Sequence, residues 1–159
     1  MVFVTLGSQK FPFDRLLRAV DELIASGELT DEVFAQTGYS TYEPQHYAYS
    51  AFLDREEFAA HEAAADIVIT HGGTGAIIGA VKQGKKVIAV PRLAQYGEHV
   101  DDHQRQLIDQ FREQNLICGL DDCSQLGEAL RTVRETTYDT YVSNTDTILN
   151  DIRTYLGTL

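Results

Sequence analysis

Residues 70–75, Thr-His-Gly-Gly-Thr-Gly, place three glycines within four positions directly after an apolar run. Glycines between a strand and a helix leave backbone N–H groups uncovered, and the partial positive charge of a helix start attracts phosphate. A plain turn needs fewer glycines than this. The segment therefore predicts a site for a phosphorylated ligand, and a nucleotide diphosphate is the first ligand to consider.

A second polar segment follows the next apolar run. Residues 87–90 are Val-Ile-Ala-Val and lead into Pro91-Arg92, and residues 98–104 read Glu-His-Val-Asp-Asp-His-Gln. If both apolar runs are strands of one open α/β sheet, the groups that follow them share the crevice where such sheets bind ligands. Together the two segments favour a nucleotide-sugar site.

Strand and helix patterns alternate along most of the chain. β-branched and apolar runs predict buried strands, and apolar residues at helical spacing predict helices. The strands are expected at 2–6, 32–37, 49–53, 67–70, 87–90 and 116–118, and the helices at 13–25, 54–64, 101–113 and 124–135. This order predicts an α/β fold with a Rossmann-like, doubly wound and mostly parallel sheet in a single domain spanning residues 1–159.

Residues 137–159 form a separate pattern. Apolar side chains recur there every three, four or seven residues, which predicts one amphipathic helix; they are Tyr138, Tyr141, Thr145, Ile148, Ile152, Tyr155 and Leu159. The apolar stripe can fold back on the sheet of its own chain or dock on a partner protein.

Charge and cysteine content limit the partners. The 13 basic and 24 acidic side chains give a formal charge of −11, which argues against nucleic-acid binding and against direct attraction to an anionic membrane. Cys118 and Cys123 are too few for a disulfide framework and lack companions for a zinc site. The N-terminus shows neither a basic leader nor a span-length apolar run, so a cytoplasmic protein without a membrane span is expected.

With these residues in place, the chain resembles MurG-like family-28 glycosyltransferases in their C-terminal domain. It more closely resembles the stand-alone catalytic subunits of two-part enzymes, such as the PssE-like proteins of exopolysaccharide and capsule synthesis. The motifs that carry the resemblance are Gly7-Ser8 with Phe13-Asp14-Arg15-Leu16, Gln36-Thr37-Gly38, Phe52-Leu53-Asp54, His71 to Gly75, residues 84–88, and Pro91-Arg92 with residues 98–104.

The resemblance implies the donor-binding half of a GT-B glycosyltransferase. It implies an inverting transfer of galactose, glucuronic acid, glucose or N-acetylglucosamine from a UDP-sugar to a lipid-linked saccharide. The acceptor half would be a membrane-anchored, PssD-like subunit that recruits this chain to the inner face of the cell membrane. A non-catalytic accessory subunit is the alternative, since in two-part systems one subunit can serve mainly as a scaffold.

The same resemblance suggests roles for individual residues. Gly7 and Ser8 would approach the diphosphate, although a plain tight turn explains them too, and Leu53 would meet uracil through its main chain. The other candidates are His71, Gly72, Gly73, Thr74 and Gly75 for phosphate or sugar, Arg92 for phosphate or a sugar carboxylate, and His103 and Gln104 for donor-sugar hydroxyls. His103 and Gln104 could instead be solvated residues at a helix start, and Arg92 could be a surface ion pair.

The chemistry expected needs no metal and no cofactor. Helix-start amides can stabilise departing UDP, and a base must take the acceptor proton. Glu98 and His99 are the candidate catalytic residues here, while the family implies a base on the partner. Both could instead close over the donor, with Glu98 as a substrate-binding candidate, or face the partner. One departure from the family is Gly79, which stands where single-chain relatives carry a ribose-binding glutamate.

Two other readings of these motifs are weaker. Gly73, Gly75 and Gly79 form a pattern like that of nicotinamide-binding proteins, but it lies mid-chain and the next strand ends in Pro91-Arg92 without the expected acidic residue. His99 and His103 have the spacing of a zinc helix, but Val100 stands where a metalloprotease needs glutamate.

Overall fold

Six parallel strands form one sheet in the computed structural model. The structure describes residues 1–6, 12–71, 74–91 and 103–138; for Thr74, His103 and Gln104 it describes the backbone only. The strands are β1 (Val2–Thr5), β2 (Val33–Gln36), β3 (Ala48–Ser50), β4 (Ile67–Thr70), β5 (Lys86–Ala89) and β6 (Cys118–Gly119). Their order is β3-β2-β1-β4-β5-β6, and every neighbouring pair is parallel. The predicted Rossmann-like α/β fold is confirmed.

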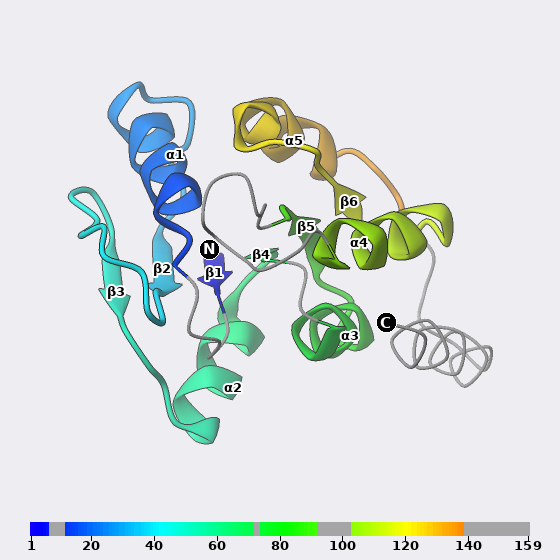
Figure 1. The fold of residues 1–159 in the computed structure, drawn as a ribbon, viewed down its shortest axis with the longest axis horizontal. Coiled ribbons are helices and arrows are strands. Elements are labelled where there is room, and N and C mark those ends of the chain that lie inside the picture. Colours follow the sequence, from blue (N-terminus) through cyan, green and yellow to red (C-terminus); the bar gives the residue numbers. More distant parts are fainter. Residues whose placement is uncertain (7–11, 72–73, 92–102, 139–159) are drawn as a thin grey trace.

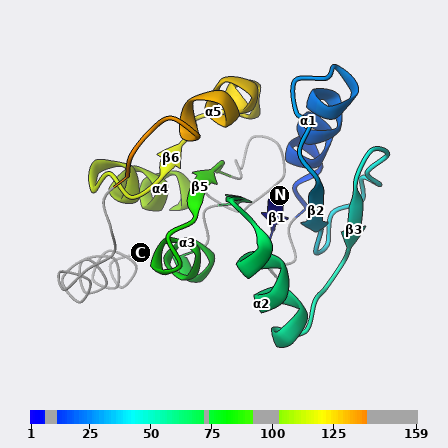
Figure 2. The ribbon, with the colours of Figure 1, turned by 180° about the vertical axis from the view of Figure 1, so that it is seen from behind.

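Helices cover both faces of this sheet (Figures 1 and 2). They are α1 (Asp14–Ala25), α2 (Arg55–Ala64), α3 (Thr74–Lys82), α4 (His103–Glu113), the short 3-10 helix η2 (Cys123–Gln125) and α5 (Leu126–Val133). Helices α1 and α5 share one face, and α2, α3 and α4 lie on the other. None of the helices in the described residues is long and apolar enough to cross a lipid bilayer.

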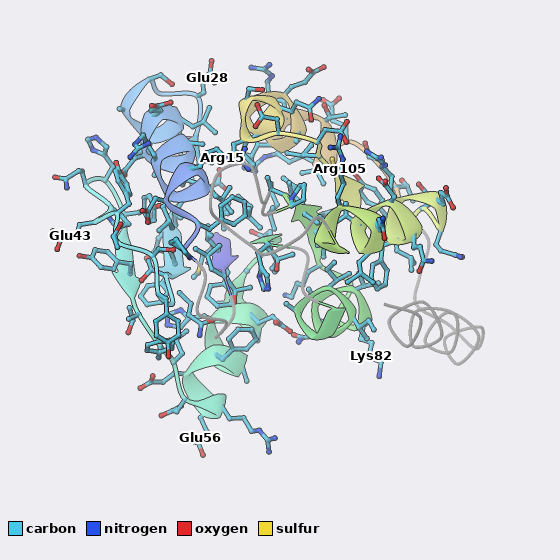
Figure 3. The ribbon with its side chains drawn as sticks, viewed as in Figure 1. Arg15, Glu28, Glu43, Glu56, Lys82 and Arg105 are labelled. Carbon is cyan, nitrogen blue, oxygen red and sulfur yellow. The ribbon has the colours of Figure 1, made fainter. Side chains whose placement is uncertain are left out.

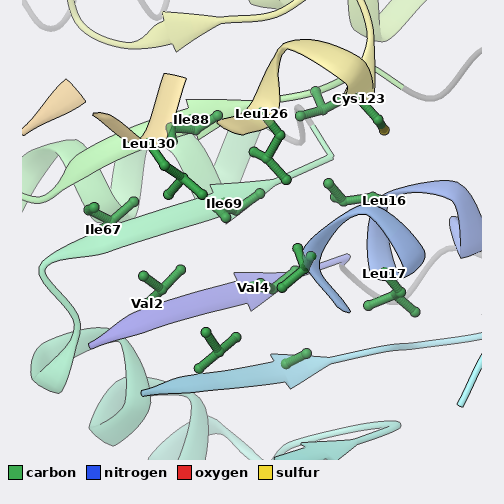
Figure 4. Close-up of a cluster of buried hydrophobic side chains, with 14 of the residues drawn as sticks. Val2, Val4, Leu16, Leu17, Ile67, Ile69, Ile88, Cys123, Leu126 and Leu130 are labelled. Atoms are coloured by element: carbon green, nitrogen blue, oxygen red, sulfur yellow. The ribbon is translucent and has the colours of Figure 1, made fainter. Parts of the chain in front are cut away.

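Alternating side chains along the strands build two separate cores. Val2, Val4 and Ile69 pack with side chains of α1 and α5 on one face (Figure 4). Phe3 and Val68 pack on the other face with side chains of α3 and α4. Strands buried on both faces need apolar residues at successive positions, which is why these segments read as continuous apolar runs.

Local sequence signals mark the start of α2 and the end of α1 where they were expected. Asp54 caps α2 by accepting from the Glu57 amide at 2.7 Å, and the Glu57 carboxylate lies 3.4 Å from the Asp54 amide that it accepts from, so a capping box is present. Gly27 ends the turn after α1 with a φ of 83°, a conformation that favours glycine. Both boundaries agree with the helices predicted for 13–25 and 54–64.

Two predicted boundaries near the C-terminus need correction. The strand expected at 116–118 is β6 at Cys118–Gly119, because the turn closed by the Leu116 amide on the Phe111 carbonyl keeps residues 116 and 117 out of the sheet. Asn115 in that turn has a φ of 55°. The helix expected from residue 124 begins as η2 and becomes α-helical only at Leu126. Of the amphipathic helix predicted for 137–159, only the first two positions belong to the described part of the chain. Residues 139–159 lie outside it, so this helix stays a prediction.

Candidate functional site

Three helices begin next to the same edge of the sheet. Helices α1, α3 and α4 follow the carboxyl ends of β1, β4 and β5, and these strands are parallel. The chain leaves β1 toward β2 on one side and later returns to β4 on the other, so β1 and β4 flank the topological switch point. Open α/β sheets bind ligands at this point, and helix starts attract anions there.

A row of buried polar side chains crosses the sheet at this edge. Thr5 is opposite Gln36 on one side and opposite Thr70 on the other, and all three are less than 10 % exposed. The Thr5 hydroxyl donates to Gln36 Oε1 at 2.8 Å. His71 Nδ1 lies 3.4 Å from the Thr5 carbonyl oxygen and 3.4 Å from Thr70 Oγ1. Buried polar side chains are uncommon in a sheet core, so this edge is the candidate for a functional site.

Gly75 is the glycine of the predicted phosphate loop whose surroundings the structure describes. It lies in the first turn of α3 and is exposed, and a Cβ added there would meet no atom within 4 Å among the described residues. Its φ lies outside the left-handed range. Among the described residues, neither packing nor backbone conformation therefore requires glycine at this position.

The other predicted residues divide into two groups. His71 is 4 % exposed at the end of β4, and the backbones of Thr74 and of His103 and Gln104 start α3 and α4 at the carboxyl edge. The structure thus brings the described residues of both predicted segments to one edge. Gly7, Ser8, Gly72, Gly73, Arg92, Glu98 and His99 lie outside the described residues, so their roles remain predictions.

Leu53 lies beside an exposed aromatic pair. Its side chain is half-buried and packs on the core that contains Phe3 and Val68. Phe52 and Tyr39 are 48 % and 50 % exposed, and their rings meet edge to face with centroids 5.3 Å apart. Tyr39 follows β2 and Phe52 follows β3, so the pair stands at the same carboxyl edge as the polar row. An exposed ring is a surface on which a planar base can stack.

The loop that carries Tyr39 is fastened to α1 by two carboxylates. Asp14 accepts from the Thr41 amide at 2.7 Å, the Thr41 hydroxyl at 2.5 Å and the Tyr42 amide at 2.9 Å. Burial raises the pKa of Asp14, but these hydrogen bonds outweigh it and hold the pKa below its ordinary value. Asp21 lies two turns further along α1 and is 4 % exposed. It accepts hydrogen bonds from Tyr42, Gln45 and His46 of the same loop. The loop therefore has a fixed place beside the carboxyl edge.

Gly79, the departure from the family pattern, faces a buried carboxyl group of the neighbouring helix. A Cβ on Gly79 would lie 3.5 Å from Oε1 of Glu62 in α2, and Glu62 is 4 % exposed. Gln83 Nε2 donates to this Oε1. A glutamate at position 79 would bring a second carboxylate beside the first, which like-charge repulsion disfavours. The neighbouring Glu62 carboxyl thus gives a reason for the absence of a glutamate at position 79, although a Cβ there would make only an ordinary contact.

The Glu62 carboxyl predicts a pH-dependent effect on stability. Burial raises its pKa above the ordinary value of 4.5, although nearby Lys85 acts in the opposite direction. Because the folded state holds this proton more tightly than the unfolded state, Glu62 weakens stability as pH rises from 4.5 through the folded pKa. Glu62→Gln keeps an acceptor for Gln83, so we expect the variant to gain stability over the wild type as pH rises.

Urea unfolding at several pH values between 4 and 8 checks this expectation. Glu56→Gln is the control, because Glu56 is an exposed carboxylate of the same helix that points away from the protein (Figure 3). A stability difference between Glu62→Gln and the wild type that stays constant across this range would show that the Glu62 carboxyl is not the titrating group.

Several residues of this edge were not among the sequence-based candidates: Thr5, Gln36, Thr70, Tyr39 and Phe52. A polar residue at the last position of an otherwise apolar strand was the available signal for the first three. Tyr39 and Phe52 belong to motifs that carry the resemblance or adjoin them, but their exposure depends on the tertiary fold.

Comparisons with known proteins agree with this geometry. A curated relative, the UDP-N-acetylglucosamine transferase subunit ALG13 of Kluyveromyces lactis, is 38% identical over 52 residues, which are 33% of this chain and 24% of that protein. Among solved structures, the glycotransferase of kitacinnamycin and the calicheamicin glycosyltransferase CalG4 both match with a TM-score of 0.59. Their identities are 17% and 19%; the matches cover 85% and 86% of this chain but only 35% and 34% of those chains.

The solved structures show the fold alone, and the chain spans about a third of their length. SnogD from Streptomyces nogalater matches in the same way, with a TM-score of 0.50, 19% identity and coverage of 84% of this chain and 38% of that one. The family model for the glycosyltransferase family 28 C-terminal domain matches residues 1–146. The parallel sheet, the polar switch point and this match together show that the chain belongs to the glycosyltransferase family 28 C-terminal domain family.

Proposed function

We propose that this chain is the donor-binding, catalytic subunit of a UDP-sugar-dependent, inverting glycosyltransferase. The observation that carries the proposal is the carboxyl edge at the switch point, where α1, α3 and α4 begin beside the buried polar row and where Gly75 leaves open space at the start of α3. Amides at helix starts suit a diphosphate and hold it without a metal ion.

The nucleoside would extend from this point toward β2 and β3. The exposed Phe52 ring and the main chain of Leu53 stand at the carboxyl ends of those strands. A uracil base can stack on the ring while the main chain of Leu53 offers hydrogen bonds to its edge. The sugar would then lie over β4 and β5, where α4 begins with His103 and Gln104.

The reaction follows from this placement. An acceptor hydroxyl oxygen attacks the anomeric carbon on the face opposite the UDP, the bond from that carbon to the phosphate oxygen breaks, and UDP leaves with both electrons. A base takes the hydroxyl proton. We assign the base to the partner subunit, with Glu98 and His99 as candidates on this chain. Helix-start amides stabilise the negative charge that develops on UDP.

The acceptor half would come from another subunit. The ALG13 relative is named as a transferase subunit, which supports a two-part arrangement. We therefore propose a membrane-associated, PssD-like partner that presents a lipid-linked saccharide during exopolysaccharide or capsule synthesis. Galactose, glucuronic acid, glucose and N-acetylglucosamine are the donor sugars to compare.

Calorimetric titration of the purified chain with UDP tests the donor site. We expect binding of UDP, with or without a metal chelator, and no binding of NADH under the same conditions. Absence of heat with millimolar UDP would overturn the proposal.

Substituting His103 and Gln104 together tests the catalytic role. We expect the double variant to abolish transfer by the complex without dissociating the subunits, whereas loss of assembly would indicate an accessory role.

A further inference from the structure

Arg15 joins three segments that are far apart in the sequence. It is the second residue of α1, and its side chain is 20 % exposed. One guanidinium nitrogen, Nη1, pairs with Asp122 Oδ1 in front of η2, and the other, Nη2, donates to the Pro91 carbonyl oxygen at 3.3 Å. The guanidinium also lies over the Phe13 ring, 5.5 Å from its centroid. Figure 3 shows Arg15 between α1 and α5.

The partner carboxylate of Arg15 is itself held in place. The Ser124 hydroxyl donates to Asp122 Oδ2 at 2.8 Å, and Asp122 forms a capping box with Gln125 at the start of η2. The hydrogen bond from Ser124 lowers the pKa of Asp122, and nearby Arg15 adds to this effect. Asp122 is therefore ionised at neutral pH, and an arginine remains charged throughout this range. The bridge from α1 to Pro91 and Asp122 has both charges in place.

The position of this bridge connects it with the candidate donor site. Pro91 is buried and is the second residue after β5, directly before Arg92 and the segment with Glu98 and His99. Arg15 lies in the first turn of α1, just beyond the segment with Gly7 and Ser8. In the sheet, β4 lies between β1 and β5. The guanidinium thus joins the start of α1 to Pro91, beyond the end of β5, across the switch point.

We propose that Arg15 is a positioning residue for the donor site, acting through the Pro91 carbonyl and Asp122. It sets the distance between the start of α1 and the end of β5, so that groups from both sides engage one UDP-sugar. This inference rests on the proposed function. Two parallel N–H groups of a planar fork can serve the carbonyl and the carboxylate together, whereas the single ammonium group of a lysine has no such fork.

The substitution Arg15→Lys tests this role, because it keeps the charge and removes the double bridge. We expect UDP affinity measured by calorimetry to fall by about tenfold or more, since small displacements of binding groups have large effects. The matched control is Arg134→Lys. Arg134 forms an ion pair with Asp31 at 2.7 Å, far from the carboxyl edge. We expect the two variants to unfold at similar temperatures and only Arg15→Lys to lose affinity.

A second substitution separates positioning from direct contact with phosphate. Asp122→Asn retains the Arg15 guanidinium but weakens its anchor, so a positioning role predicts weaker UDP binding in this variant as well. Unchanged or tighter UDP binding in Asp122→Asn would overturn the inference. So would a UDP affinity of Arg15→Lys within about twofold of the wild type, which is a free-energy difference of about 0.4 kcal/mol. If the wild-type chain binds no UDP, the proposed function itself fails, and the two failures are thereby distinguished.

Discussion

Gly75→Asp is expected to weaken UDP binding strongly while leaving the protein folded and slightly more stable. Gly75 is exposed in the first turn of α3, and a Cβ there would meet no atom of the described residues within 4 Å. An aspartate replaces a poor helix former and interacts favourably with the helix dipole, so the free energy of unfolding should rise by about 1 kcal/mol. The same carboxylate would stand beside a bound diphosphate. Repulsion between these negative charges should weaken UDP binding by at least about 100-fold.

Opposite signs for stability and binding make this variant informative. Thermal unfolding gives the first quantity and UDP calorimetry the second. Gly75→Asn is the matched control, because it has nearly the same shape without the charge. We expect it to bind UDP more weakly than the wild type but more tightly than Gly75→Asp. Wild-type affinity in Gly75→Asp would place the diphosphate away from α3 and contradict the proposed site.

Asp21→Ala is expected to cause the largest loss of stability. The buried Asp21 carboxylate accepts from the Tyr42 hydroxyl at 2.6 Å, the Gln45 amide at 2.8 Å and the His46 amide at 3.0 Å. Removing it leaves three donors without this acceptor, at a loss of about 3 kcal/mol. For a domain of this size that corresponds to a decrease in the unfolding temperature of roughly 6–12 °C.

Asp21→Asn provides the control for this effect. The asparagine side chain keeps one oxygen that can accept but replaces the other by an NH₂ group, so an intermediate loss is expected. Urea unfolding measures both variants. Because Asp21 fastens the loop that carries Tyr39, the Ala variant should also weaken UDP binding well below its unfolding temperature. A decrease in unfolding temperature of less than about 2 °C for Asp21→Ala would show that the loop finds other acceptors.

The elements of the fold could be predicted from sequence because they depend on nearby residues. β-branched runs such as Ile67–Thr70 predicted the buried strands, and apolar spacing predicted α1. Asp54 with Glu57 has the pattern that begins a helix, and the structure shows both hydrogen bonds of the box. The short β6 was misplaced by two residues, because the Leu116 amide closes the end of α4 on the Phe111 carbonyl oxygen, with Asn115 at a φ of 55°. Asparagine tolerates this conformation at helix ends, so the signal for the turn is local.

The amino-acid sequence by itself determined the alternation of strands and helices, the glycine-rich turn and the family, because these depend on residue types at short spacing. Only the tertiary structure decided which distant residues meet: Thr5 with Gln36, Asp21 with the loop at 42–46, and Arg15 with Pro91 and Asp122. Strand order and register bring together groups that lie 21 to 107 positions apart. That order is set by the total burial of both sheet faces, a property of the whole chain that no single segment contains.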